Sequence, residues 1–365
     1  MMRTRCKRVP GVRRIAVLRA NALGDFIFAL PALEALRAAY PQAEIVLLAK
    51  KWHATFLQGR PGPVDRVVVV PPYPGVSEEP ATPCTPRTQH SLECTAELEQ
   101  FFEAMAQERF DLAIQIHGGG RYSNPFLLRL GARMNVGLKT PDAVPLDRWV
   151  SYIYYQPEIL RYLEVVSLVG AAPIVLESRI SVIEEDLLEA QSVVPEKARP
   201  LVALHPGAGD PQRRWPTEKF AAVGDALSVR GAQIVVIGTT EEKQLVEAVV
   251  TNMKAGAQNL CGRLSLGGLA GLLSRCRVLI SNDSGPLHLA AAVGTATVGI
   301  YICFNLVTAG LPTRVQHRPV ISWRVQCPIC GIDRSYTFCE HRPSFVADIP
   351  AEEVIAPALD LFSGQ

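Results

Sequence analysis

The sequence has no long apolar stretch. None of its apolar runs approaches the roughly 18 residues of a membrane-spanning helix. A secretory signal is also missing, because residues 15–18 are shorter than the roughly 7–15-residue apolar core of such signals and are followed by Arg19. We therefore expect a cytoplasmic protein with no transmembrane segment.

The sequence also has little net charge. Lys and Arg total 37 against 35 Asp and Glu, a formal charge of +2, which gives no reason to expect nucleic-acid binding. The first 14 residues form a local exception, with these basic residues and no acidic one: Arg3, Arg5, Lys7, Arg8, Arg13 and Arg14. This segment is either a solvated tail or a weak contact for anionic headgroups at the inner face of the cytoplasmic membrane.

A disulfide framework is not expected either, since nine cysteines in 365 residues do not resemble a small secreted scaffold. Hydrophobic residues make up 48% of the chain and charged residues 20%, the balance of a globular protein. The length favours two domains.

Short apolar runs alternate with helical patterns in the first half of the chain. Residues 14–19, 45–49, 67–70 and 111–117 are strand-like, and residues 26–39 have helical spacing. Continuous apolar strands separated by helices are typical of a parallel sheet covered on both faces. The proline-rich residues 71–86 interrupt the series as a loop or insertion.

The same alternation begins again after a helix expected over residues 158–169. Strands are predicted at 201–205, 233–238, 278–282 and 297–301, and helices at 217–230, 241–253, 286–293 and 351–362. We therefore predict an α/β protein with two doubly wound, Rossmann-like domains that face each other across a cleft. The expected boundaries are residues 1–172 and 173–345, with residues 346–365 forming a C-terminal helix that packs back on the first domain.

The first candidate site follows the first strand and contains Asn21, Gly24 and Asp25. Gly24 would allow a sharp turn at the strand end. Asp25 is then either a helix N-cap or a carboxylate that takes a proton from an acceptor hydroxyl. Pro31 predicts a kink or an irregular first turn in the helix that follows.

The second candidate site follows the strand at 201–205. Gly207 lies in a glycine-containing loop that can approach a phosphate, and Arg213 can bind a phosphate through two hydrogen bonds. The alternatives are an ordinary turn and a solvated arginine. The loop lacks the third glycine of the dinucleotide fingerprint, which weakens a nicotinamide-enzyme interpretation.

The third candidate site follows the strand at 278–282 and contains Asp283, Ser284, Gly285 and His288. Ser284 can cap the next helix, and the free N–H groups at its start can bind a diphosphate. The alternative is a capped helix without a ligand, with His288 as a satisfied core residue.

A fourth group has the composition of a metal site. Cys327, Cys330, Cys339 and His341 are four soft ligands close together in the sequence. They could hold structural zinc, although their spacing matches no standard zinc module. The alternative is a loop of reduced thiols.

These pieces occur together in one family. Residues 19–40 (RANALGDFIFALPALEALRAAY) and 41–70, followed by 205–207 with 213–216 and by 282–288, resemble glycosyltransferase family 9, the ADP-heptose:lipopolysaccharide heptosyltransferases. The resemblance runs through nearly the whole chain in the same order. Arginine at 213, where the family usually has lysine, the insertion near residue 80 and the cysteine-containing tail depart from the family pattern.

The resemblance implies a GT-B fold, an acceptor-binding first domain and a nucleotide-sugar-binding second domain. It implies inverting transfer of heptose from ADP-heptose to a lipid-linked inner-core acceptor, with no cofactor and no essential metal. Asp25 matches the catalytic base, and Asn21 and Gly24 the acceptor-side loop. The donor- and diphosphate-binding positions are matched by Arg213, Gly207, Asp283, Ser284, Gly285 and His288. The rivals are a related transferase using another nucleotide sugar, a nucleotide-sugar epimerase, and a non-catalytic nucleotide-sugar-binding protein.

Overall fold

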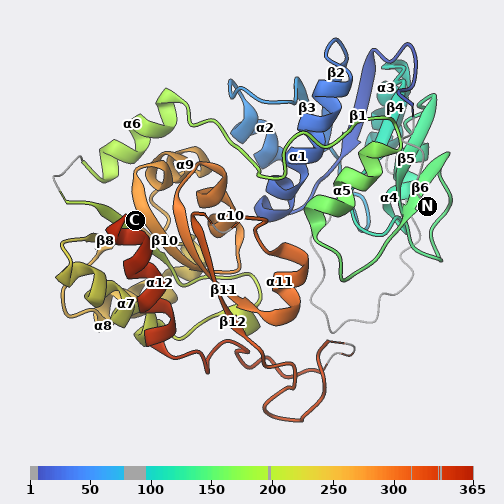
Figure 1. Cartoon of the computed structure of the whole chain (residues 1–365). Helices are drawn as coiled ribbons and strands as arrows, with labels where there is room; N and C mark the ends of the chain where they lie inside the picture. Colours follow the sequence, from blue (N-terminus) through green and yellow to red (C-terminus); the bar gives the residue numbers. More distant parts are fainter. Residues whose placement is uncertain are drawn as a thin grey trace. The chain divides into compact units, whose positions relative to one another are not determined.

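The computed structural model describes residues 7–77, 96–195, 199–313, 315–335, 337 and 339–364. The chain divides into two compact units, Met1–Ser178 and Arg179–Gln365 (Figure 1). Part of the expected proline-rich loop, and Arg3 and Arg5 of the basic segment, lie outside the described residues. Among the described residues, no helix has the length and apolar character required to cross a membrane.

The first unit contains a six-stranded parallel sheet with the strand order β3-β2-β1-β4-β5-β6. Its strands are β1 (Arg14–Leu18), β2 (Glu44–Ala49), β3 (Arg66–Val69), β4 (Leu112–Gln115), β5 (Met134–Lys139) and β6 (Arg148–Ser151). Its helices are α1 (Leu23–Ala39), α2 (Lys51–Leu57), α3 (Ala96–Gln107), α4 (Ser123–Leu128) and α5 (Glu158–Ser167). Helix α1 is assigned without interruption through Pro31.

The second unit contains a parallel sheet with the order β12-β11-β10-β7-β8-β9. Its strands are β7 (Leu201–His205), β8 (Gln233–Val236), β9 (Gln258–Asn259), β10 (Cys276–Asn282), β11 (Ala296–Ile302) and β12 (His317–Ser322). Its helices are α6 (Glu184–Val193), α7 (Thr217–Val229), α8 (Lys243–Asn252), α9 (Leu266–Ser274), α10 (Gly285–Ala292), α11 (Cys303–Ala309) and α12 (Ala351–Ser363), with short 3₁₀ turns η1 (Pro211–Arg213) and η2 (Thr240–Glu242).

The two sheets have the same strand order when each is numbered from its own first strand. That order is 3-2-1-4-5-6, the doubly wound arrangement of dinucleotide-binding domains. The order reverses between β1 and β4 in the first unit and between β7 and β10 in the second. Ligands of such sheets bind beyond the carboxyl ends of the strands at this switch point. The predicted α/β class with two doubly wound, Rossmann-like domains is confirmed, and the switch points indicate where to look for a site.

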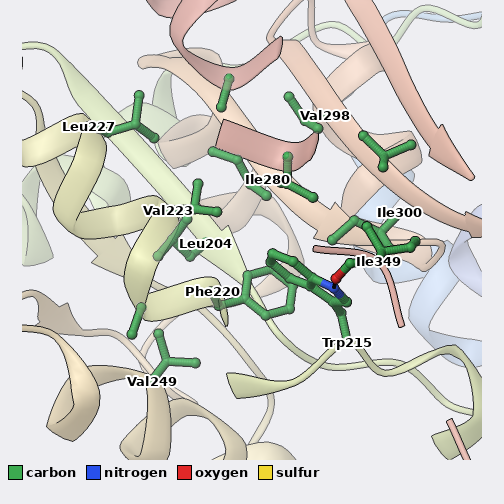
Figure 2. Close-up of a cluster of buried hydrophobic side chains, with 14 of the residues drawn as sticks. Leu204, Trp215, Phe220, Val223, Leu227, Val249, Ile280, Val298, Ile300 and Ile349 are labelled. Carbon is green, nitrogen blue, oxygen red and sulfur yellow. Dashed lines mark hydrogen bonds between the residues drawn. The ribbon is translucent and has the colours of Figure 1, made fainter. Parts of the chain in front are cut away.

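Apolar side chains of both sheets are buried beneath helices. In the second unit, Leu204 and Ile280 pack with Phe220 and Trp215 in one cluster (Figure 2). The indole N–H of Trp215 donates to the carbonyl oxygen of Ile349 at 3.0 Å. This bond satisfies the polar group of a fully buried tryptophan and ties the segment before α12 to the core.

Helix α12 packs within the second unit. It lies against α7 (Figure 1), and Val354, Ala358 and Phe362 are buried in the same apolar cluster. The sequence predicts packing of this helix against the first domain instead. Its apolar stripe was recognised correctly, but a stripe does not identify the surface that covers it.

Basic residues near the start of the described chain are partly paired. Arg14 begins β1 and forms ion pairs with Glu44 and Glu108, both at 3.2 Å. Arg14 is therefore anchored to the first unit. The interpretation of the basic segment as a solvated tail does not hold for this residue.

Candidate functional site

Asp25 lies at the start of α1, beside the switch point of the first unit. It is the third residue of the helix, and Ala22 occupies the N-cap position. One carboxylate oxygen of Asp25 accepts the Ala22 N–H at 3.1 Å, and the other accepts Nη2 of Arg19 at 2.9 Å. Asp25 is therefore not the N-cap residue itself, although its carboxylate accepts a backbone N–H at the start of the helix, as the capping alternative predicted. The side chain is 33% exposed, so an acceptor hydroxyl can reach it.

Arg19 holds this carboxylate in place. Its side chain is 2% exposed and also donates to the carbonyl oxygen of Ile116 at 2.7 Å and to Glu158 at 2.9 Å. Burial lowers the pKa of Arg19, but Tyr162, Asp25 and Glu158 outweigh it and raise that pKa above its ordinary value. Sequence reasoning missed Arg19 and Glu158. The sequence signal that could have identified Arg19 is a cationic residue that directly follows the apolar run of residues 15–18.

Asn21 and Gly24 complete this loop. The side-chain oxygen of Asn21 is buried and accepts no hydrogen bond from the described residues, so a ligand could supply the donor. Gly24 is the second residue of α1, and the bend falls at Asn21. The prediction of a sharp turn at Gly24 is therefore wrong by three residues.

His117 follows β4 on the other side of the same switch point. Its Nδ1 accepts the Ala20 N–H at 3.2 Å, and its Nε2 lies 3.2 Å from the carbonyl oxygen of Gly75. Burial, followed by the charge of Arg19, lowers the pKa of His117 to about 3. With both ring nitrogens engaged and the ring neutral, His117 supports the Asp25 loop and is poorly placed to act as a base.

In the second unit, the switch point brings the second and third candidate sites together. The side-chain amide of Asn282, at the end of β10, donates to the carbonyl oxygen of Pro206 at 2.8 Å, and its oxygen accepts the Trp215 N–H at 3.0 Å. Asn282 thus fixes the loop after β7 on both sides. Sequence spacing alone could not show this convergence, which depends on β7 and β10 being neighbours.

Gly207 lies against a carboxylate in this loop. A Cβ atom at this position would lie 1.8 Å from Oε1 of Glu242, so only glycine fits without displacing that side chain. Nε2 of His205 donates to Glu242 at 3.3 Å. Burial raises the pKa of Glu242, but the bond from His205 and other neighbours outweigh it and hold that pKa below its ordinary value.

Asp283 is the shared acceptor for several side-chain donors of this region. It is buried, and its carboxylate accepts hydrogen bonds from Arg213 at 3.3 Å, His288 at 3.2 Å and Asn305 at 3.0 Å. Burial raises the pKa of Asp283, but the bond from His288 and the nearby charges of His288 and Arg213 outweigh it, so that pKa is lowered. Asp283 therefore positions Arg213, whose side chain remains 29% exposed.

Ser284 and Gly285 form the start of α10. Ser284 occupies the N-cap position, but its hydroxyl contacts His205 at 3.1 Å and the Asn282 carbonyl oxygen at 3.1 Å. The predicted side-chain cap is therefore wrong. The helix itself begins at Gly285 and contains Pro286 in its first turn, as expected. Its N-terminal dipole and Arg213 place positive charge at one switch point, which suits an anionic ligand.

The fourth group is also gathered in space. Each of Cys327, Cys330, Cys339 and His341 offers one ligand atom, and these four atoms lie within 4.8 Å of one another. Burial raises the pKa of Cys327, but hydrogen bonds from the backbone N–H groups of Cys330 and Ile329 help to bring it to about 7. The proximity of the four side chains fits a metal-binding group better than a loose thiol loop.

Two Rossmann-like units, one with a cationic switch point and one with an accessible carboxylate, have the composition of a GT-B glycosyltransferase. Residues 98–328, more than half of the chain, match glycosyltransferase family 9 (heptosyltransferase). The chain belongs to this family.

Individual relatives agree with this assignment. Lipopolysaccharide heptosyltransferase 2 of Escherichia coli K12 is 24% identical over 309 residues, which cover 79% of this chain and 82% of the relative. A family 9 glycosyl transferase from Veillonella parvula has a similar fold, with a TM-score of 0.74, 22% identity and coverage of 97% and 98% of the two chains. The E. coli heptosyltransferase WaaC, solved with ADP, has a TM-score of 0.68, 17% identity and coverage of 95% and 99%.

Proposed function

We propose that this family 9 glycosyltransferase transfers heptose from ADP-heptose to an inner-core lipopolysaccharide acceptor and inverts the anomeric carbon. The observation that carries the proposal is the group formed by Arg213, Asp283 and the start of α10 at the second switch point. The names of the relatives, which include lipopolysaccharide heptosyltransferases and a structure with ADP, support the choice of donor and acceptor.

The second unit would bind the donor. Negative charge develops on the diphosphate as the bond to the sugar breaks, and preorganised donors stabilise such charge without reorganisation. Arg213 is suited to this role because Asp283 fixes its direction through Nη1 alone, and its other guanidinium nitrogens make no hydrogen bond within the described residues. Gly207 would offer its backbone N–H to the phosphate, while the space left by its missing side chain is filled by the Glu242 carboxylate.

The first unit would activate the acceptor. Asp25 takes the proton of the attacking hydroxyl in this proposal, because its carboxylate is accessible and rigidly oriented by Arg19 and the Ala22 N–H. Neutral His117 and buried Arg19 support its position. The reaction then needs no divalent metal, since Arg213 and the helix terminus meet the charge of the leaving group.

The acceptor would be attached to lipid. Trp149, Ile153 and Tyr154 lie close together in the sequence of the first unit and are 45%, 57% and 59% exposed. Aromatic and aliphatic side chains of this kind favour the boundary between water and lipid. They support a protein that works at the inner surface of the cytoplasmic membrane.

The test is an assay of nucleotide release with ADP-, UDP- and GDP-linked sugars, each with and without a lipid-linked inner-core acceptor. We expect ADP release from ADP-heptose that depends on the acceptor and continues in the presence of EDTA. Donor conversion without acceptor would indicate an epimerase. A preference for UDP or GDP donors would indicate another transferase, and binding without turnover a non-catalytic protein.

A further inference from the structure

The four soft ligands of the second unit lie outside the region proposed to bind the diphosphate. We propose that Cys327, Cys330, Cys339 and His341 bind one Zn²⁺ ion in a structural site that holds the Pro211–Arg213 turn in place. The site itself does not depend on the proposed function, but its consequence for donor binding does.

The distances fit a tetrahedral ion. Zinc–sulfur bonds of about 2.3 Å separate the sulfur ligands of a tetrahedral site by about 3.8 Å. The four ligand atoms lie within 4.8 Å of one another, so side-chain rotations and small shifts can bring them to a common centre. Three thiolates and one imidazole form a recognised set for structural zinc, and soft sulfur disfavours Mg²⁺ and Ca²⁺.

Backbone hydrogen bonds hold the first two ligands, Cys327 and Cys330, in one turn. Residues 325–334 form a tight turn, closed by the Cys327 N–H to the Ile332 carbonyl oxygen at 2.9 Å and by the Gly331 N–H to the Cys327 carbonyl oxygen at 2.8 Å. Gly331 has φ of 73°, a conformation that favours glycine. This turn places Cys327 and Cys330 on one side of the site.

Cys339 and His341 supply the other side. Nδ1 of His341 is buried and has no hydrogen-bond partner within the described residues, which is costly for a polar atom unless something else binds the ring. Nη1 of Arg334 lies 3.4 Å from Sγ of Cys339 and also donates to the Cys339 carbonyl oxygen at 3.1 Å. Three thiolates and Zn²⁺ carry a net negative charge, which the Arg334 guanidinium can balance.

The loop that carries these ligands also forms hydrogen bonds with the turn that carries Arg213. Nη2 of Arg334 donates to the side-chain oxygen of Gln212 at 3.1 Å, and the side-chain amide of Gln212 donates to the His341 carbonyl oxygen at 3.0 Å. Gln212 is buried and directly precedes Arg213. A metal that fixes Cys339 and His341 therefore also fixes Gln212, and through it the backbone of the residue proposed to bind diphosphate.

The first measurement is the metal content of the full-length protein by mass spectrometry. We expect about one zinc per chain, and loss of that zinc in Cys330→Ser, which changes an exposed side chain and should leave packing intact. Cys261→Ser is the matched control, because its hydroxyl can keep the bond that Sγ makes to the Thr239 carbonyl oxygen at 3.0 Å. A chelator should lower the thermal midpoint of the wild type and of Cys261→Ser, and it should have no further effect on Cys330→Ser.

Three results would overturn the zinc site: no bound metal, iron in place of zinc, or equal zinc in Cys330→Ser and wild type. Cobalt substitution provides a second test of the ligands. Bound Co²⁺ should show the intense visible absorption of tetrahedral cobalt thiolate in the wild type and lose it in Cys330→Ser. A disulfide among the three cysteines, detected by thiol titration, would also refute the proposal.

Calorimetry with ADP tests the link to Arg213. We expect Cys330→Ser to bind ADP several-fold more weakly than wild type, and Cys261→Ser to bind it equally well. Unchanged ADP affinity in a zinc-free variant would refute the link. If wild type contains zinc but binds no ADP, the proposed function fails while the metal site stands.

Discussion

Replacing Asp25 with asparagine separates its structural role from its chemical role. Two of the bonds to this carboxylate come from the Ala22 N–H and from Arg19. Asparagine offers only one oxygen, so it can keep one of them and must turn an amide N–H₂ group toward the other donor. Arg19 still has Glu158 and the Ile116 carbonyl oxygen as partners, so its charge does not become unpaired in the interior.

The expected loss of stability is therefore one charge-assisted hydrogen bond. Such bonds contribute about 1.5–3 kcal/mol, and the partial exposure of Asp25 reduces this to roughly 1–2 kcal/mol. In a unit of this size, that loss lowers the thermal midpoint by roughly 2–8 °C. Turnover should fall much further, by roughly 10²–10⁴-fold, because asparagine cannot accept the proton of the acceptor hydroxyl. ADP affinity should be nearly unchanged.

Glu158→Gln is the matched control. It makes the same chemical change in the other carboxylate that contacts Arg19, and Glu158 also contacts Arg161 and Tyr162. It should therefore cost at least as much stability, while turnover falls far less than in Asp25→Asn. Thermal midpoint, turnover and ADP affinity are measured on both purified variants at a temperature well below either midpoint. An active Asp25→Asn protein, or equal loss of turnover in both, would remove Asp25 as the base.

Three further variants test the second unit and the pH response. Arg213→Ala should weaken ADP binding by roughly tenfold to a hundredfold, the effect of about one charge-assisted bond, with Arg213→Lys intermediate in calorimetry. Gly207→Ala should lower both the thermal midpoint and ADP affinity by displacing Glu242, whereas Gly209→Ala, with no atom within 4 Å of the new Cβ, should do neither. His53 is a buried residue of α2, and burial together with nearby cations lowers its pKa to about 3. Between about pH 6.5 and pH 3, the unfolded state therefore binds a proton that the folded state does not. The free energy of unfolding should therefore decrease as the pH is lowered through this window. In His53→Phe, the dependence of that free energy on pH, measured by urea unfolding, should be shallower by up to about 1.4 kcal/mol per pH unit. An unchanged pH dependence would contradict the lowered pKa of His53.

Among the described strands, the sequence predicted every interior strand except β5 (Met134–Lys139), and of the edge strands it predicted β3 (Arg66–Val69) alone. Residues 201–205 and 278–282 are continuous apolar runs because neighbours cover both faces of β7 and β10. By contrast, β6 (Arg148–Ser151) and β12 (His317–Ser322) are edge strands with exposed or polar residues, and the sequence analysis did not identify them. A continuous apolar run is what makes a parallel strand visible in a sequence. The partly exposed β3 has such a run in its three valines, whereas the buried β5 contains Asn135 and Gly137 and was missed.

The positions of the candidate sites could also be predicted from the buried strands. Turn-forming and polar residues directly after buried strands marked Asp25, Gly207 and Asp283, because strand ends meet at one edge of a parallel sheet. The partners of these residues could not be predicted, since Arg19 and Glu158 are 139 residues apart in the chain and meet only through the fold. Likewise, Ser284 has the residue type of a cap, but its hydroxyl contacts His205, which a local pattern cannot reveal.

The position of α12 in the second unit has a consequence for folding during synthesis. Val354, Ala358 and Phe362 complete the apolar layer over β10 and β11, yet they are made well after those strands. The first unit ends at Ser178 and can close its core while the ribosome is still translating the second. The second unit, by contrast, exposes an apolar surface until residue 362 has left the exit tunnel. It is thus the part of the nascent chain most in need of chaperone protection, and a ribosome stalled before α12 should release a protein that aggregates through its second unit.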